Sequence, residues 1–506
     1  MTADDRPDII FLMTDQQRWD ALGVHNPLVK TPNLDRLIEA GVIFPQATCQ
    51  APMCVPSRHS LMTGLYPSQN GVRSNESATP GDSAVAAPLL AEAMRAAGYL
   101  TAGFGKTHWG RTPETPSTRG FDVRVVGTRD LGLETGAVNW QEEGDPDGRA
   151  AYLEMTRGYG PGEEEPLGYI GATSTIPARN HPDGWIAEKA LEWLDGPDLD
   201  TDKPLFFYLS FVKPHAGHNP AAEFEALYDI DDIPDLEMPP WDESRYDHIR
   251  VRDDHSPFLG ARSQRWRDAW RALTARERRQ ATLRYWANCS WLDSLFGQAL
   301  DRLARRGRLS NALIVFASDH GELLGERNFQ FSKYCLYDSS VRVPLVVSGT
   351  AVAPHLRGTT DERPAALVDL YPTIADVAGF PVHDTAVGTS LLRRARRTGS
   401  FAEMHEPAPA WMWRTARYKL IVFVDPHGEG AQGELYDLQT DPAEWHNLYG
   451  DPSYLAVRAE LMAEMVAHLA TAFAVTPSHG ARGVLAEYDD AVVPPSRGRV
   501  VSEVDA

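Results

Sequence analysis

Four short apolar runs, each followed at once by polar and titratable residues, most constrain how this 506-residue chain can fold. Apolar runs of this length without alternation are typical of strands buried on both faces of a parallel sheet. Their polar successors then lie at the carboxyl ends of the strands, the edge at which open α/β sheets bind ligands. The runs are DIIFLM at 8–13, YLTAGF at 99–104, LFFYLSFV at 205–212 and ALIVFAS at 312–318.

Helical patterns separate these runs and indicate an α/β fold class. Amphipathic stretches at 87–98, at 183–194 and from Arg276 to about Arg305 predict helices. We also expect a strand at 341–347. A further helix at 365–379 contains Pro372 and is expected to be either kinked or divided into two pieces.

The pattern changes at about residue 385, where short strand-like runs alternate with turns before a helix at about 453–473. These features predict a large domain at 1–384 and a C-terminal subdomain at 385–506, an antiparallel sheet plus a helix. The Pro-containing last 30 residues are expected to be extended. They form either an arm on a partner subunit, which would make a homo-oligomer, or a mobile tail.

Two long segments lack these regular patterns. Residues 111–182 are rich in Gly, Pro and acidic residues and are expected to form an insertion that shapes substrate access. Residues 221–275 appear irregular in sequence, acidic and then Arg-rich, and they suggest no role.

Composition excludes several classes of partner. The formal net charge of −21 disfavours nonspecific binding to nucleic acid or to an acidic membrane, so neither partner is expected. No apolar run approaches membrane-spanning length, and the acidic N-terminus lacks the pattern of a signal peptide. Four cysteines form no disulfide framework. We therefore expect a cytoplasmic protein with reduced thiols.

The segment Cys54-Val55-Pro56-Ser57-Arg58 predicts an anion site. Proline favours a first helical turn, which places Cys54 near a helix N-terminus, where the dipole favours negative charge. Arg58 adds a cation one turn further on. The alternative is a buried structural cysteine, which is common near helix starts.

Each apolar run ends in side chains able to bind metal, hold an oxyanion or transfer a proton. Taken singly, Asp15 is better interpreted as a capping residue and His215 as a structural one, while the other two pairs fit a loop or capping role as well as a functional one. The repetition at four strand ends favours function. Trp109, Trp140, Trp411 and Trp413 line a pocket or, as aromatic residues more often do, pack in a core. The strand-end residues are Asp15 and Gln16, Lys106 and His108, His215, and Asp319 and His320.

In combination, these residues make the chain resemble a type I sulfatase of the alkaline phosphatase superfamily. The matching segments occur in the family's order from residue 8 to about 450. They are TDQQRWD, TPNLDRLIEAGVIFPQAT, CVPSRHSLMTGLYP, GKTHWG, KPH, SDHGELLGE, Lys333 before YDSSVRVPLVV, and ELYDLQTDPAEWHNL. The resemblance implies a large mixed sheet sandwiched by helices, with residues 1–384 as the catalytic domain.

The resemblance also implies a chemistry. In the family, a formylglycine-generating enzyme oxidises the motif cysteine, here Cys54, to formylglycine, whose hydrated aldehyde is the nucleophile. Pro56 and Arg58 match the modification signal, and Arg58 would also steady the gem-diol. Divalent-metal ligands are matched by Asp15, Gln16, Asp319 and His320, with the formylglycine completing the shell.

The remaining matched residues act on the sulfate ester. Lys106, His215 and Lys333 match residues that hold sulfate oxygens, and His215 or Lys333 would help to protonate the leaving alcohol. His108 matches the base that collapses the sulfated hemiacetal. A covalent step of this kind divides one difficult displacement into two easier ones, while metal and cations neutralise charge on the sulfate oxygens.

Two positions depart from the common pattern. Many sulfatases have a second carboxylate at the position of Gln16 and an asparagine at that of His320. The pair found here resembles the choline-sulfatase and phosphonate monoester hydrolase branches. Fewer charged oxygens and an added imidazole suit Mn²⁺ more and Ca²⁺ less, and both metals stay open. Lys106 and His108 are both present, as in sulfate-ester enzymes.

The sequence therefore predicts a sulfuric ester hydrolase acting on a small-molecule sulfate ester. The alternative with the same machinery is a phosphonate monoester hydrolase or phosphodiesterase. A phosphatase or phosphotransferase would expect Ser or Thr as the nucleophile, and Ser57 is the weaker candidate beside Cys54. A non-catalytic binding protein would have lost motif residues, and all the expected ones are present.

Overall fold

The structure is a computed structural model of the chain. It describes residues 6–75, 85, 87–108, 119–126, 138–156, 170–199, 201–241, 248–249, 257–393, 397–406, 408–424 and 431–474. The expected extended tail and Trp109 lie outside these residues. Among the residues described, no helix is both long and apolar enough to span a bilayer.

A nine-stranded mixed sheet forms the centre of the described structure. β1 (Asp8–Asp15) lies between β7 (Leu205–Pro214) and β8 (Ala312–Ser318) and is parallel to both. β4 (Leu100–Gly105) pairs with β7 in parallel, and β9 (Leu345–Ser348) pairs with β8 in the antiparallel sense. The four predicted buried strands therefore end at one edge of the sheet. The full order is β10-β2-β9-β8-β1-β7-β4-β5-β6.

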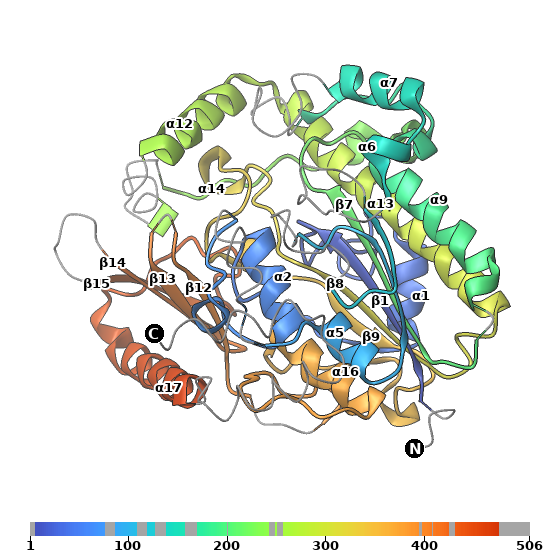
Figure 1. Cartoon of the computed structure of the whole chain (residues 1–506). Coiled ribbons are helices and arrows are strands. Elements are labelled where there is room, and N and C mark those ends of the chain that lie inside the picture. The colour runs from blue at the N-terminus through green and yellow to red at the C-terminus, as the bar shows by residue number, and fades with distance from the viewer. Residues whose placement is uncertain are drawn as a thin grey trace, which may run out of the picture.

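Helices cover both faces of this sheet (Figure 1). One face carries α1 (Pro32–Glu39), α9 (Pro182–Asp195) and α13 (Ala275–Arg305), and the other α2 (Cys54–Thr63), α5 (Leu90–Ala96) and α16 (Leu370–Ala378). Because successive side chains of a strand point to opposite faces, β1 contributes to two cores. Phe11 packs in the core that holds α2, α5 and α16, and Leu12 packs in the core that holds α1, α9 and α13.

A four-stranded antiparallel sheet forms the C-terminal part, as predicted (Figure 1). Residues of α17 (Leu455–Ala474), among them Leu461, share one apolar cluster with this sheet. Other sheet residues, including Met412 and Ile421, belong to the main core that contains Phe11. The strands are β12 (Ser400–Met404), β13 (Ala410–Arg414), β14 (Tyr418–Val424) and β15 (Ala431–Asp437).

Three expectations need correction. The strand expected at 341–347 is confined to β9, because α15 (Asp338–Val341) and Pro344 occupy its first half. The helix expected from residue 365 begins only after β11 (Ala365–Ala366) and is in two pieces, which is one of the two expected forms. The pieces are η8 (Leu367–Asp369) and α16, and Pro372 lies in the first turn of α16, where no backbone N–H is needed. The segment 221–275 is not wholly irregular, because it contains α12 (Pro257–Ala272).

The insertion expected at 111–182 contains short regular elements where it is described, and Trp140, the first residue of α6, is buried in the core. Trp413 is also buried, so these two tryptophans follow the packing interpretation. The remaining strands are β2 (Val42–Ile43), β3 (Ala47–Thr48), β5 (Val123–Val126), β6 (Val138–Asn139), β10 (Thr359–Thr360) and β11 (Ala365–Ala366). The remaining helices are α3 (Pro67–Asn70), α6 (Trp140–Glu143), α7 (Pro146–Thr156), α10 (Ala222–Glu225), α14 (Glu326–Phe329), and the 3₁₀ turns η4 (Ala178–Asn180), η5 (Pro197–Leu199), η6 (Ile230–Asp232), η7 (Pro354–Leu356), η8 (Leu367–Asp369) and η9 (Pro452–Tyr454).

Candidate active site

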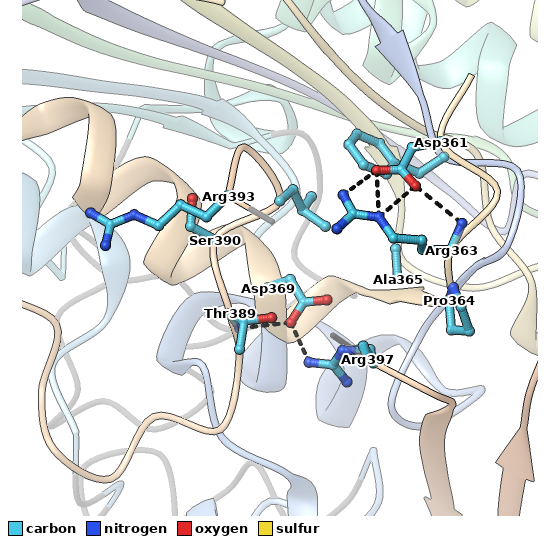
Figure 2. Close-up of a pocket in the computed structure, with 11 residues that line it drawn as sticks. Asp361, Arg363, Pro364, Ala365, Asp369, Thr389, Ser390, Arg393 and Arg397 are labelled. Atoms are coloured by element: carbon cyan, nitrogen blue, oxygen red, sulfur yellow. Dashed lines mark hydrogen bonds and ion pairs between the residues drawn. The ribbon is translucent and has the colours of Figure 1, made fainter. Parts of the chain in front are cut away.

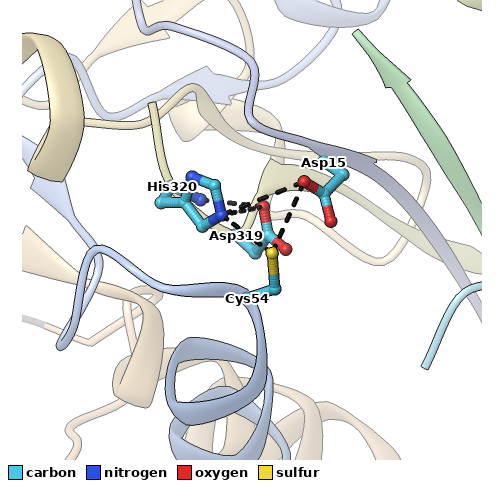
Figure 3. Close-up of side chains that lie close together, drawn as sticks. All are labelled: Asp15, Cys54, Asp319 and His320. Carbon is cyan, nitrogen blue, oxygen red and sulfur yellow. Dashed lines mark hydrogen bonds and ion pairs between the residues drawn. The ribbon is translucent and has the colours of Figure 1, made fainter. Parts of the chain in front are cut away.

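Two strand ends and one helix start bring together a buried cluster of metal-ligating side chains (Figure 3). Asp15 ends β1, Asp319 and His320 directly follow β8, and Cys54 begins α2. One ligand atom from each of the four lies within 4.8 Å of those of the other three, and all four residues are buried. The strand-end pattern of the sequence therefore corresponds to a single site at the carboxyl edge of the sheet.

Cys54 occupies the first position of α2, as its proline predicts. Met53 before it is extended, and Pro56 lies in the first helical turn. The Sγ atom lies 3.0 Å from Lys333 Nζ, 3.2 Å from His320 Nε2 and 3.8 Å from Asp15 Oδ1. Burial alone would raise the pKa of the thiol, but Lys106, Lys333 and His320 hold that pKa well below its usual value. The thiol position thus favours an anion.

Arg58 donates hydrogen bonds to both carboxylates of the cluster. Its Nε lies 2.7 Å from Asp319 Oδ2 and its Nη2 lies 3.3 Å from Asp15 Oδ2. Its Nη1 donates to the carbonyl oxygen of Lys106 at 2.8 Å and to Ser210 Oγ at 2.9 Å. All three guanidinium nitrogens are therefore engaged with the strand ends. The expected contact of Arg58 with a gem-diol stays a prediction.

Gln16 follows Asp15 with a left-handed backbone, φ 66°, which turns the chain back across the strand end. Its backbone N–H donates to Asp319 Oδ1 at 3.0 Å. Its side-chain Oε1 accepts from Lys333 Nζ at 3.0 Å, while its Nε2 donates to the buried carboxylate of Glu322. The amide oxygen of Gln16 thus faces the same lysine as the sulfur of Cys54.

The other predicted residues surround the same point. Lys106 pairs with Asp15 through its Nζ. His108 is buried, and burial together with the charge of Lys106 lowers its pKa to about 3. His215 directly follows β7. Burial and the charge of Lys333 lower the pKa of His215, while the Cys54 thiol opposes that lowering for both histidines.

The donor set fits a divalent cation. His320 Nδ1 lies 3.0 Å from the carbonyl oxygen of Gly321, a contact that places a proton on Nδ1, so in the neutral ring Nε2 would carry the lone pair that a cation needs. That Nε2 lies 3.7 Å from Asp319 Oδ1 and 3.9 Å from Asp15 Oδ1. Two carboxylate oxygens and an imidazole nitrogen, with an amide oxygen nearby, suit Mn²⁺. Ca²⁺ prefers a site with more charged oxygens, so this donor set suits it less.

The structure adds residues that the sequence analysis did not select. Glu322, three residues after Asp319, contacts Gln16, and Asn75 Oδ1 accepts from the backbone N–H of Val55 at 3.2 Å. Of these two residues, only Glu322 has a signal in the sequence, because it is an acidic residue directly after Asp319-His320-Gly321. The Ser57 hydroxyl, the weaker nucleophile candidate, donates to the carbonyl oxygen of Asp319, so it is held behind the site.

A pocket lined by three arginines lies outside this cluster, among residues between 361 and 397 (Figure 2). Its arginines face carboxylates: Arg363 pairs with Asp361, and Arg397 pairs with Asp369. Arg393 pairs with Asp376 in the same way. These ion pairs neutralise the guanidinium groups, so we interpret the pocket as part of the packing between neighbouring segments and not as an anion site.

A buried donor set able to hold a divalent cation lies beside a cysteine at a helix start, at the carboxyl edge of a mixed α/β sheet, and this arrangement is typical of a metal-assisted hydrolase. The family model described as Sulfatase matches residues 7–380, and the chain belongs to that family. It is accordingly a sulfuric ester hydrolase. A second model, "N-sulphoglucosamine sulphohydrolase, C-terminal", matches residues 325–471.

Relatives match most of the chain, and solved structures share its fold. The chain is 25% identical to an arylsulfatase of Clostridium perfringens, covering 89% of this chain and 91% of the relative. It is 29% identical to a choline-sulfatase of Rhizobium meliloti, covering 88% and 83% respectively. The structure of a phosphonate monoester hydrolase from Silicibacter pomeroyi has the same fold, with a TM-score of 0.73, 22% identity and coverage of 94% and 97%.

Proposed function

We propose that the protein hydrolyses a small-molecule sulfate monoester, in the manner of an arylsulfatase, through a formylglycine made from Cys54. One observation carries this proposal: the Cys54 sulfur lies between the ammonium group of Lys333 and a carboxylate–imidazole donor set. The sulfur stands in for the oxygens of the hydrated aldehyde, which supplies a nucleophile that can later expel sulfate by carbon–oxygen cleavage. A divalent cation, Mn²⁺ or Ca²⁺, would be held by Asp15, Gln16, Asp319 and His320.

The residues of the chain supply charge and proton transfer. Lys106 and Lys333 present ammonium groups around the reacting position, where they would neutralise sulfate oxygens as charge develops. Burial and Lys106 lower the pKa of His108 to about 3, so its ring is neutral near pH 7, which is the form that the proposed base needs before it takes the proton. His215 completes the ring of groups that touch the ester.

Phosphonate monoester or phosphodiester hydrolysis is the second candidate. The Gln16 and His320 pair and the similarity to a phosphonate monoester hydrolase structure favour it, whereas Lys106 and His108 favour sulfate. Comparing kcat/KM on matched aryl sulfate and aryl phosphonate esters separates the two. A clear preference for the phosphonate would reverse the choice of main substrate class.

Mass spectrometry of the peptide that contains residue 54 tests the nucleophile. The protein is expressed with and without a formylglycine-generating enzyme, the maturation partner that we propose. An aldehyde mass at residue 54 that rises in step with aryl sulfatase activity is the expected result. A fully active preparation with unmodified Cys54 would refute the formylglycine mechanism and favour the thiolate, whose pKa is already low.

Location and assembly are also proposals. A cytoplasmic location is supported by composition and by four buried cysteines, none of which forms a disulfide with another described residue. A homo-oligomer is proposed from the length of chain beyond α17. Sedimentation of the full chain and of a variant ending at residue 474 tests this proposal. An equal number of subunits in both assemblies would show that the tail does not cause oligomerisation.

A further inference from the structure

The carboxylate of Glu322 joins three segments of the candidate site. Oε2 accepts from Gln16 Nε2, directly after β1. Oε1 accepts from the backbone N–H of Leu324 at 3.1 Å and from that of Ser332, the residue before Lys333. The side chain is fully buried, and the backbone carbonyl of the same residue accepts from Arg18 Nη1 at 2.9 Å. Glu322 is therefore fixed in place and acts on its neighbours as an acceptor only.

A glutamine amide has two chemically different ends, and only its oxygen can bind a cation. Glu322 accepts from the NH₂ end of Gln16, and Lys333 donates to the oxygen end at 3.0 Å. Both neighbours therefore select the same orientation of the amide. Without the acceptor at residue 322, rotation by half a turn would present NH₂ hydrogens to the donor set and to the ammonium group of Lys333.

We infer that Glu322 is a positioning residue that orients the Gln16 amide toward the cation and anchors the Lys333 loop. The inference rests on the proposed function, because it takes the cluster of Asp15, Asp319 and His320 as a cation site. Hydrogen-bond partners of metal ligands commonly contribute about 10- to 100-fold to metal affinity. Glu322 acts on Mn²⁺ binding through Gln16, without touching the ion.

Glu322→Gln is the direct test, because it keeps the size of the side chain. One oxygen becomes an NH₂ group, which faces N–H donors whichever way the new amide is turned. The Mn²⁺ dissociation constant, measured by calorimetry on protein with unmodified Cys54, is expected to rise about 10- to 100-fold. Equal affinity in Glu322→Gln and the wild type would overturn the inference.

Asp293→Asn is the matched control. Asp293 is also buried, and it accepts from two backbone N–H groups, Asn33 at 3.1 Å and Leu34 at 2.7 Å, and from the Asn33 side-chain amide at 2.7 Å. It caps α1, away from the cation cluster. Asp293→Asn is expected to lower the Tm while leaving the Mn²⁺ dissociation constant within about threefold of the wild-type value, inside the usual scatter of such comparisons. If Asp293→Asn raised the Mn²⁺ dissociation constant as much as Glu322→Gln does, the weaker binding would reflect lost stability and the inference would be overturned.

The exchange variant Gln16→Glu/Glu322→Gln keeps the inference testable if Glu322→Gln folds poorly. The new amide at 322 can donate to a carboxylate at 16 while its oxygen still accepts from Leu324 and Ser332. We expect Gln16→Glu to improve Mn²⁺ binding more in the Glu322→Gln background than in the wild type. Equal effects in both backgrounds would mean that the two residues act independently and would overturn the inference.

The wild type separates this inference from the proposed function. If the wild type binds neither Mn²⁺ nor Ca²⁺, the proposed cation site fails and the inference fails with it. If the wild type binds Mn²⁺ and Glu322→Gln binds it equally well, only the inference fails.

Discussion

Lys333 and His215 both lie beside the reacting position, but they differ in how firmly they hold a proton. Burial opposes the charge on Lys333, yet Cys54 and Asp15 raise its pKa above the usual value. Burial and Lys333 lower the pKa of His215. A bound sulfate ester adds a negative charge, which favours the protonated form of His215. We therefore propose that His215 protonates the leaving group and that Lys333 neutralises charge on the ester.

This assignment predicts a dependence on the leaving group. General acid catalysis contributes about 10²- to 10⁴-fold, most when the leaving group is a poor one. His215→Ala should therefore lose more kcat/KM with phenyl sulfate than with 4-nitrophenyl sulfate. Lys333→Met should lose a similar factor with both esters, about 10²- to 10³-fold, as expected for a lost oxyanion contact. The opposite pattern in the two variants would assign the acid to Lys333.

His181, outside the cation cluster, predicts acid sensitivity of the fold. It is fully buried with Nε2 2.9 Å from Ser174 Oγ, and burial together with Lys213 lowers its pKa from 6.5 to about 3. Above pH 6.5, both folded and unfolded states are neutral there. Below pH 6.5 the unfolded chain binds a proton that the folded chain excludes down to about pH 3, so stability falls with pH by up to about 1.4 kcal/mol per unit.

Urea unfolding at pH 7 and pH 5 measures this contribution. The wild type should lose about 2 kcal/mol more between these two values than His181→Asn does. All other titratable groups are the same in the two proteins, so their contributions cancel in the comparison. An identical loss in both proteins would show that His181 does not carry the effect.

At the scale of elements, β14 holds the loop that carries Lys333. Lys419 of β14 is fully buried, and its Nζ lies 3.1 Å from the carbonyl oxygen of Leu336 and 2.7 Å from Glu444. It also pairs with Asp338 at 2.5 Å, which Arg414 of β13 binds through two nitrogens. The C-terminal sheet therefore anchors the chain a few residues beyond Lys333.

Lys419→Met removes the cation and leaves buried carboxylates with less compensation. Breaking a buried ion pair from one side costs about 3–5 kcal/mol, so the free energy of unfolding in urea should fall by that amount. The control is Lys189→Met, whose partner Glu192 lies 2.7 Å away on the surface of α9 and which should cost about 0–1 kcal/mol. Equal losses in both variants would mean that the buried network adds no stability.

The sequence predicts the buried strands better than it predicts the segments around them. Strands β1, β4, β7 and β8 could be read from apolar runs, because burial on both faces removes polar positions. Helix α12 was missed, although Trp266 and Trp270, four residues apart and both buried, were a readable signal. The left-handed backbones of Gln16 and His108 depend on tertiary contacts and leave no local pattern.

At the scale of the whole molecule, the order of strands in the sheet could not be predicted from local sequence, because it depends on pairing between distant segments. β1 pairs with strands about 200 and 300 residues further along the chain. For the same reason, the convergence of Cys54 with Asp15 and Asp319 came from the resemblance to a family. The division at residue 384 into two domains stays a prediction.

The apolar core gives that division a test. Met412 and Ile421 of the C-terminal sheet belong to the core that contains Phe11 of β1. The backbone N–H of Glu403 in β12 donates to the carbonyl oxygen of Gln50 at 2.8 Å, four residues before Cys54. The described residues between 397 and 474 therefore complete the core and support both loops of the site, so the two parts should unfold together.

We accordingly predict that the full chain unfolds in one calorimetric transition and that a variant ending at residue 384 has none. The truncated protein would expose apolar residues of the main core and leave Asp338 without Lys419 and Arg414. A variant ending at residue 474, which keeps α17 and the whole antiparallel sheet, is the control and should unfold in one transition like the full chain. A soluble 1–384 protein with a sharp transition of its own would show that the catalytic domain is independent, and the C-terminal contacts would then tune the site without building it.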